Sequence, residues 1–250
     1  MTETGSLGCP PLTLPPAVGK IALVGGNEFR RNCEPMDRAL LAFLGKRPRV
    51  RILPTAAKEN PLLAAQNGIR YFQKLGADAG AVKILNRLDA QNPALISLLE
   101  EADLFYFAGG NPTYLLDVFQ GSPAWDEIIR LWHRGRLLAG SSAGAMILGE
   151  KIWEPGEGWR EGLGLLPGLA VLPHHKVLAS RWGVQEMLRS LPTAFYLLGI
   201  DEATALAGPP WGVLGNGEVV FYQARQTPPI PHVFKNGQEV IFPNAQRVSC

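Results

Sequence analysis

Ser142 lies between two glycines in the segment Gly140-Ser141-Ser142-Ala143-Gly144, which follows an apolar run and precedes helix-forming residues. This order predicts a strand, a sharp turn and a helix, with the serine exposed on the turn at the end of a sheet. A serine hydroxyl in that place is a candidate nucleophile. The N–H of Ala143, at the start of the predicted helix, is a candidate donor to an oxyanion. Taken alone, the segment also suits a plain turn of small residues.

A serine nucleophile needs a base to take its proton, and the base needs a third group to orient it. His174 and His175 end a predicted strand downstream of Ser142. On a strand these two side chains would point to opposite faces, so we expect only one of them to reach the serine. Asp201 and Glu202 end another predicted strand, which offers a carboxylate as the third group. Each of these residues also suits a polar strand end in solvent.

Alternating strands and helices must bring these side chains together. Apolar runs predict five buried strands at residues 20–26, 50–55, 81–85, 103–108 and 137–139. Apolar residues with helical spacing predict helices between or after these strands, at 35–44, 60–75, 93–101, 114–119 and 125–132. This alternation predicts an α/β protein with a mostly parallel sheet, whose strands carry ligand sites at their carboxyl ends. Gly109-Gly110 follows one such strand, so the Gly110 N–H is a candidate second oxyanion donor, although this glycine pair also suits a turn into a helix.

The C-terminal half is predicted to form an antiparallel edge. We expect a loop over the site at 153–161, strands at 169–175, 194–200, 203–206 and 239–242, and a helix at 182–191. Gly215-Asn216-Gly217 predicts a hairpin between strands at 211–214 and 218–222. Residues 1–19 contain four prolines and are interpreted as a disordered or extended arm, with a single domain over residues 20–250.

Composition narrows the class of protein. The 250 residues are 46% hydrophobic and 18% charged, with a formal net charge of +2, which favours a folded domain and argues against a nucleic-acid partner. The three cysteines have no C-x-x-C spacing, so neither a disulfide framework nor a zinc site is expected. There is no apolar run of transmembrane length and no secretory signal pattern. These features predict a cytoplasmic protein that does not bind membranes.

Five segments in this order resemble the dipeptidase E and cyanophycinase family of serine peptidases. They are Gly109-Gly110-Asn111, the Ser142 segment, residues 162–168, Pro173-His174 and residues 199–206. The resemblance covers residues 20–222. It implies a class I glutamine amidotransferase-like fold, a three-layer sandwich with a mostly parallel central sheet, and serine chemistry without a metal or organic cofactor. Members of the family cleave dipeptides with N-terminal aspartate, or the β-aspartyl-arginine links of cyanophycin.

By position, the resemblance implies roles for three residues. Ser142 corresponds to the nucleophile, His174 to the base, and Glu202 to the orienting acid of the cyanophycinase-like branch. The dipeptidase-like branch implies a different acid, which falls at Glu157 in the loop 154–161. Glu202 is preferred because a strand end holds a carboxylate more rigidly than a glycine-rich loop.

The resemblance also implies oxyanion donors and substrate contacts. Gly110 and Ala143 correspond to the oxyanion donors. Asn111, Lys176 and Arg181 are the expected substrate-binding residues. A basic group should pair with the carboxylate of an aspartyl substrate, and Lys176 and Arg181 are the candidates for it. The arginines that typically follow the histidine in cyanophycinase-like sequences are replaced here, which favours the dipeptidase branch.

The function expected from the sequence is therefore a serine exopeptidase acting on small acidic peptides, Asp-X or β-aspartyl dipeptides. A non-catalytic binding module on the same fold, a cyanophycinase-like enzyme and another amide hydrolase or an esterase are the alternatives. The expected partners are a small peptide and, as an open alternative, a second copy in a homodimer.

Overall fold

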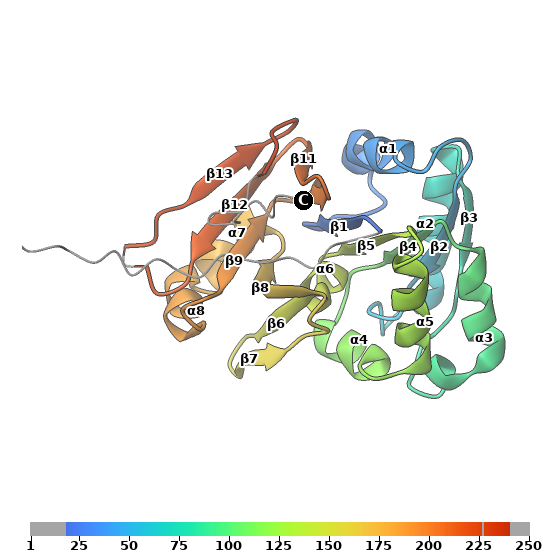
Figure 1. Ribbon diagram of the computed structural model, residues 1–250, viewed down its shortest axis with the longest axis horizontal. Helices are drawn as coiled ribbons and strands as arrows, with labels where there is room; N and C mark the ends of the chain where they lie inside the picture. The colour runs from blue at the N-terminus through green and yellow to red at the C-terminus, as the bar shows by residue number, and fades with distance from the viewer. Residues whose placement is uncertain (1–18, 227, 241–250) are drawn as a thin grey trace, which may run out of the picture.

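The computed structural model describes residues 19–226 and 228–240, and two β-sheets lie side by side in it (Figure 1). The first sheet has the strand order β11-β10-β1-β5-β4-β2-β3. Its strands are β1 (Ile21–Val24), β2 (Arg49–Leu53), β3 (Asp78–Ala81), β4 (Leu104–Phe107), β5 (Leu137–Ser141), β10 (Thr204–Gly208) and β11 (Gly212–Gly215). The run from β1 to β3 is parallel, whereas β10 and β11 join antiparallel. The predicted mostly parallel α/β sheet with an antiparallel edge is therefore confirmed.

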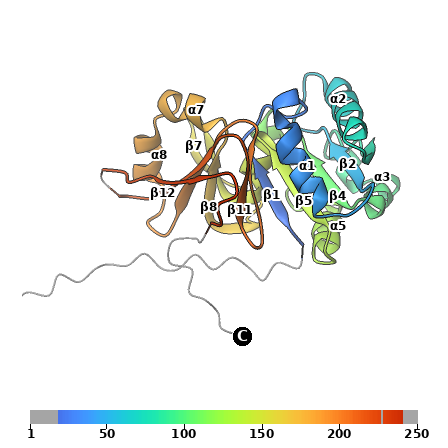
Figure 2. The same ribbon diagram turned by 90° about the horizontal axis from the view of Figure 1, so that it is seen from above.

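Helices cover both faces of the first sheet and give the three layers (Figures 1 and 2). One face packs against α1 (Glu34–Ala42) and α2 (Pro61–Lys74), and the other against α4 (Pro112–Phe119), α5 (Pro123–Trp132) and α6 (Ala143–Leu148). Short turns of helix complete this half of the molecule: η1 (Arg31–Cys33), η2 (Asp89–Gln91), α3 (Pro93–Ser97) and η3 (Leu98–Glu101). Alternate residues of each strand serve the two faces, as Leu23 and Val24 do in β1.

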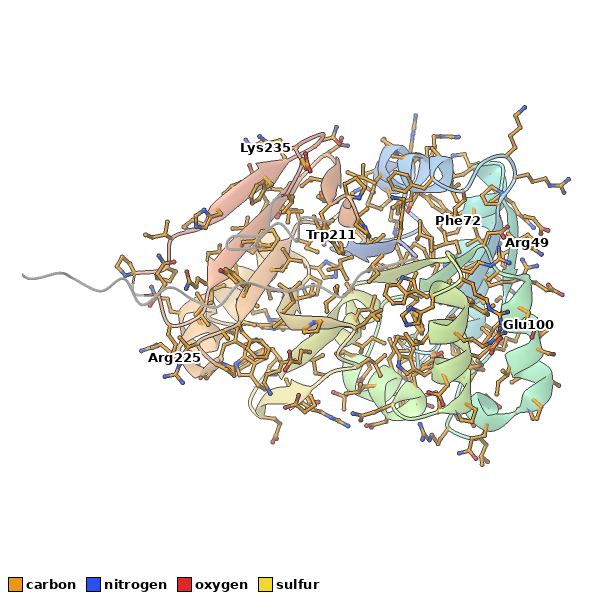
Figure 3. The ribbon with its side chains drawn as sticks, in the orientation of Figure 1. Arg49, Phe72, Glu100, Trp211, Arg225 and Lys235 are labelled. Carbon is orange, nitrogen blue, oxygen red and sulfur yellow. The ribbon has the colours of Figure 1, made fainter. Side chains whose placement is uncertain are left out.

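The second sheet has the order β13-β12-β9-β8-β6-β7. Its strands are β6 (Gly149–Glu154), β7 (Gly158–Glu161), β8 (Leu166–Leu172), β9 (Tyr196–Ile200), β12 (Glu218–Gln223) and β13 (His232–Lys235), with helices α7 (His175–Arg181) and α8 (Val184–Ser190) beside it. Figure 3 shows how far the two sheets extend, with Lys235 and Arg225 at one end of the molecule and Arg49 and Glu100 at the other. The sequence did not predict this separate sheet.

Two predictions about the C-terminal half are wrong. Residues 153–161 are not a loop but belong to the antiparallel pair β6 and β7, in which Trp153 lies opposite Trp159 with ring centroids 5.0 Å apart. The segment Gly215-Asn216-Gly217 does not close a hairpin, because β11 pairs with β10 in the first sheet while β12 pairs with β9 in the second. A turn pattern predicts only the local backbone geometry. Here the turn connects a strand of the first sheet to a strand of the second.

Other differences are shifts of element boundaries. The third strand is Asp78–Ala81 rather than 81–85, although Val82 and Ile84 are buried as an apolar run requires. Of the predicted strand 239–242, Glu239 forms an isolated bridge with Gly212, and residues 241–242 lie outside the described part. The predicted N-terminal arm also lies outside it up to residue 18, and Gly19 is already buried. In the described part of the chain, no helix combines the length and apolar character needed to cross a membrane.

Candidate active site

Ser142 occupies a strained turn between β5 and α6. Its backbone has φ 49° and ψ −109°, a conformation that non-glycine residues rarely adopt, and its N–H donates to the Val24 carbonyl at 3.0 Å. The neighbouring glycines are required by close packing, since a Cβ atom on Gly140 would lie 2.2 Å from the Gly144 carbonyl oxygen. A Cβ on Gly144 would lie 2.6 Å from the Phe107 carbonyl oxygen. The sharp turn predicted from the sequence is thus present.

Three side chains form one hydrogen-bonded chain at this turn. His174 Nε2 lies 3.0 Å from Ser142 Oγ, and His174 Nδ1 lies 2.7 Å from Glu202 Oε1. Both contacts are satisfied when Nδ1 carries the proton, so that Nδ1–H donates to Glu202 and Nε2 accepts from the serine hydroxyl. This arrangement can activate a serine and stabilise the protonated imidazole.

A left-handed turn, not a strand, decides which histidine contacts Ser142. β8 ends at Leu172, and His174 precedes α7 with φ 48° while its N–H donates to the Gly25 carbonyl at 2.7 Å. His175 turns away, and its Nε2 lies 2.9 Å from the Tyr222 hydroxyl. Burial lowers the pKa of His175. Only one of the two histidines reaches the serine, as expected, but strand alternation was the wrong reason.

The two carboxylates considered for the third position lie in different places. Glu202 follows β9, and Asn27 Nδ2 donates to its Oε2 at 3.4 Å. Glu157 lies in the turn between β6 and β7 and lines the cavity beside Ser142. Among the described residues, Glu202 is the carboxylate that contacts His174.

The two candidate oxyanion donors lie on neighbouring segments, Gly110 in the loop after β4 and Ala143 at the start of α6, and one carboxylate links these segments. The N–H groups of Gly110 and Ala143 form no hydrogen bond with any described residue. Glu28 accepts the Gly109 N–H at Oε1 (2.6 Å) and the Ser141 hydroxyl at Oε2 (2.8 Å). Sequence reasoning missed Glu28. The available signal was a carboxylate two residues beyond the glycines that follow the first strand.

A cavity of about 770 Å³ opens next to Ser142. Apolar and polar residues from both halves of the molecule line it, among them Gly110, Asn111, Met146, Trp153 and Trp182. Its charged residues are Lys58, Glu59, Glu154 and Glu157. The Asn111 side chain also caps α4 by accepting the Tyr114 N–H at 2.9 Å.

The two cations expected to bind substrate do not line this cavity. Lys176 Nζ lies 2.7 Å from Asp201 Oδ2, and this bond raises the pKa of Lys176. Arg181 is exposed at the end of α7. The cation that the cavity presents instead is Lys58, whose Nζ lies 5.1 Å from the centre of the Tyr114 ring. Across residues 19–226 and 228–240, no cluster of three His, Cys, Asp or Glu side chains is arranged to hold a metal ion.

Comparison with known proteins shows to which family the chain is related. The sequence profile of peptidase family S51 matches residues 21–208, most of the chain. The chain belongs to peptidase family S51. This result confirms the resemblance to the dipeptidase E and cyanophycinase family, and with it the assignment as a serine peptidase. No curated protein matches the sequence.

Solved structures agree with the S51 assignment. A peptidase from an acI-B1 Actinobacterium superimposes with a TM-score of 0.79 at 30% identity, over 90% of this chain and 98% of that one. A protein from Listeria monocytogenes EGD-e assigned to Peptidase E superimposes with a TM-score of 0.55 at 17% identity, over 87% of this chain and 98% of that one. At that identity the second likeness concerns the fold alone.

Proposed function

We propose that this S51 peptidase is an exopeptidase that cleaves Asp-X or β-aspartyl dipeptides through an acyl-enzyme on Ser142. The observation that carries the proposal is the hydrogen-bonded chain from Ser142 through His174 to Glu202, beside two N–H groups that have no partner among the described residues. A nucleophile, a base, an orienting carboxylate and oxyanion donors are together the requirements of acyl transfer.

In the proposed reaction, Ser142 Oγ attacks the scissile carbonyl carbon while His174 Nε2 takes the hydroxyl proton. The Gly110 and Ala143 N–H groups donate to the oxyanion of the tetrahedral intermediate. His174 then gives its proton to the leaving amine as the C–N bond breaks. Water, deprotonated by His174, then attacks the acyl carbon. The bond from this carbon to Ser142 Oγ breaks, the acid leaves, and His174 returns the proton to Ser142 Oγ. Throughout, Glu202 accepts from Nδ1–H and stabilises the imidazolium.

The cavity supports a short substrate. A volume of about 770 Å³ falls in the range that small ligands fill, about 300–1,000 Å³. The carboxylates of Glu59 and Glu157 suit a free N-terminal ammonium, and Lys58 suits a carboxylate. A di- or tripeptide with both charges therefore matches this site better than an extended chain.

The test combines labelling with turnover. We expect a fluorophosphonate to modify Ser142, mapped by mass spectrometry, and the Ser142→Ala protein to stay unlabelled. A panel of Asp-X and β-Asp-X dipeptides, with Ala-X peptides as controls, should show hydrolysis of the acidic members. Labelling of Ser142 without hydrolysis of any of these peptides would indicate that the substrate is another amide or an ester and not a dipeptide. A folded protein that is neither labelled nor active would overturn the proposal.

A further inference from the structure

A second cavity, of about 610 Å³, adjoins the one that Ser142 lines. The two cavities share Ala57 and Gly109 in their walls. This shared wall lies at the nucleophile, because a Cβ atom on Gly109 would be 3.2 Å from Ser142 Cβ. A molecule bound near Ser142 is therefore within reach of the second cavity.

Positive charge dominates the second cavity. Its charged residues are Arg30, Arg31, Arg70, Lys74, Glu28 and Glu34. Glu34 pairs with Lys74 at 2.6 Å, which lowers the pKa of Glu34, and the nearby charges of Arg38 and Arg31 lower it further. Glu28 binds the Gly109 N–H and the Ser141 hydroxyl. Arg70 donates to the Asn67 side chain at 2.8 Å.

The three arginines of this cavity are not held by ion pairs within the described part of the chain. Among the described residues, Arg30, Arg31 and Arg70 form no ion pair, and all three are exposed to solvent. A guanidinium offers a planar fork of N–H donors that matches a carboxylate. These donors are available to a ligand.

The first cavity has the opposite balance of charge. It presents Lys58 against the carboxylates of Glu59 and Glu157, while Glu154 pairs with Arg160 at 3.5 Å. The shared wall thus separates an acidic region from a basic one, both next to Ser142. A short peptide carries an ammonium group at one end and one or two carboxylates, and this distribution of charge complements the two cavities.

We propose that the second cavity is a carboxylate-binding subsite of the peptidase, in which Arg30, Arg31 and Arg70 bind a carboxylate of the substrate. The subsite rests on the proposed function and takes the recognition role expected of Lys176 and Arg181. The bound group is either an acidic side chain or the C-terminal carboxylate of the peptide. These two sources share their chemistry, and the choice of peptides separates them.

A binding experiment tests the subsite without turnover. The full chain carrying Ser142→Ala is titrated with Asp-Leu by calorimetry, with and without Arg31→Gln and Arg70→Gln. Because hydrogen bonds to charged groups are worth about 1.5–3 kcal/mol, we expect binding to weaken about 10- to 100-fold. Arg134→Gln is the matched control, since Arg134 is exposed and lines neither cavity. The inference would be overturned if the Ser142→Ala protein bound Asp-Leu equally well with and without the arginine substitutions, or did not bind it at all.

Kinetics on the chain with Ser142 intact identify the carboxylate. Asp-Leu is compared with Asn-Leu, which lacks the side-chain carboxylate, and with Asp-Leu amide, which lacks the terminal one. The arginine variants should raise KM for Asp-Leu with kcat nearly unchanged, and the preference over one of the two analogues should vanish. Unchanged preference over both would overturn the subsite while leaving hydrolysis by Ser142 intact. Absence of labelling at Ser142 would instead count against the proposed function, and the calorimetric result would still decide the subsite.

Discussion

At the scale of single residues, the candidate active site depends on one contact for each nitrogen of His174. We expect Ser142→Ala and His174→Ala each to lower kcat on the order of 10⁶-fold. The two residues act as a unit, so removing either one removes nearly the whole rate enhancement that they give together. His175→Ala should cost little activity, since its ring contacts Tyr222 and not Ser142. Steady-state kinetics on variants with native circular dichroism check this. An inactive His175→Ala beside an active His174→Ala would contradict it.

The orienting carboxylate gives a second prediction. Glu202→Gln should lower kcat by about 10⁴-fold, because the amide holds the imidazole in place but removes the charge that stabilises its protonated form. Glu157→Gln is the matched comparison, since Glu157 lines the cavity without contacting His174. It should change KM more than kcat. Loss of activity in Glu157→Gln with a normal Glu202→Gln would move the acid to the turn between β6 and β7.

Asp37 gives a prediction about stability and pH. Its Oδ2 accepts the Tyr71 hydroxyl at 2.7 Å, and its Oδ1 has no hydrogen-bond partner among the described residues. Burial raises the pKa of Asp37 to about 7. The folded state therefore binds more protons than the unfolded state between about pH 4 and 7, and stability is lost as pH rises through 7.

Asp37→Asn tests this dependence, since the amide oxygen can still accept the Tyr71 hydroxyl. Between pH 5 and pH 8, the free energy of unfolding of the wild type should fall by on the order of 2.5 kcal/mol relative to the variant. Urea unfolding at the two pH values measures this difference. A constant difference between the two proteins would mean that Asp37 does not titrate in this range.

At the scale of elements, the loop after β1 contacts the segments that carry His174, Glu202 and the oxyanion donors. The Gly25 carbonyl accepts the His174 N–H at 2.7 Å, and the Gly26 carbonyl accepts the Ala203 N–H at 3.1 Å. Asn27 contacts Glu202, and Glu28 links the loop after β4 to the end of β5, the two segments next to the oxyanion donors. Phe29 anchors the loop among aromatic rings, including that of Tyr106 at 5.4 Å between centroids.

Glu28 allows this role to be tested. Glu28→Ala removes both bonds, so we expect kcat to fall about 10- to 100-fold, less than the loss of an entire oxyanion donor. Glu28→Gln should retain most activity, because its oxygen can accept the Gly109 N–H while its amide donates to Ser141 Oγ. Parallel measurements of kcat, KM and unfolding separate positioning from stability. Equal loss in both variants would show that the charge, and not the pair of bonds, is required.

At the scale of the whole molecule, one hydrophobic cluster joins the two sheets. It includes Leu23 and Phe107 of the first sheet together with Leu198 and Val219 of the second. Trp211, labelled in Figure 3, packs against the same cluster. Because one cluster spans both sheets, we expect the described residues 20–226 and 228–240 to unfold as one unit.

Tryptophans in both halves make this prediction measurable. Trp125 and Trp132 report on the first sheet, and Trp153 and Trp159 on the second. Urea transitions followed by fluorescence in variants that retain one pair or the other should have the same midpoint as far-ultraviolet circular dichroism. Separate midpoints would divide the chain into two domains and contradict the single-domain prediction.

The sequence alone determined the features that depend on neighbouring residues. The apolar runs and helical spacing predicted the alternating elements, and the small residues around Ser142 predicted the sharp turn, because strand, helix and turn preferences act over a few positions. The same local signals misassigned residues 153–161 and the segment at Gly215, since both depend on which distant strand is the partner.

Tertiary structure decided the contacts between distant segments. Glu202 and Glu157 were both open from the sequence, and only the fold brings the Glu202 carboxylate to 2.7 Å from His174. The fold likewise pairs Lys176 with Asp201 and places Glu28 within hydrogen-bond distance of both Gly109 and Ser141. Hydrogen bonds require a donor and an acceptor that lie close together, at best near ~3 Å, and are well aligned. Which side chains meet that condition depends on the packing of both sheets, which no single stretch of sequence specifies.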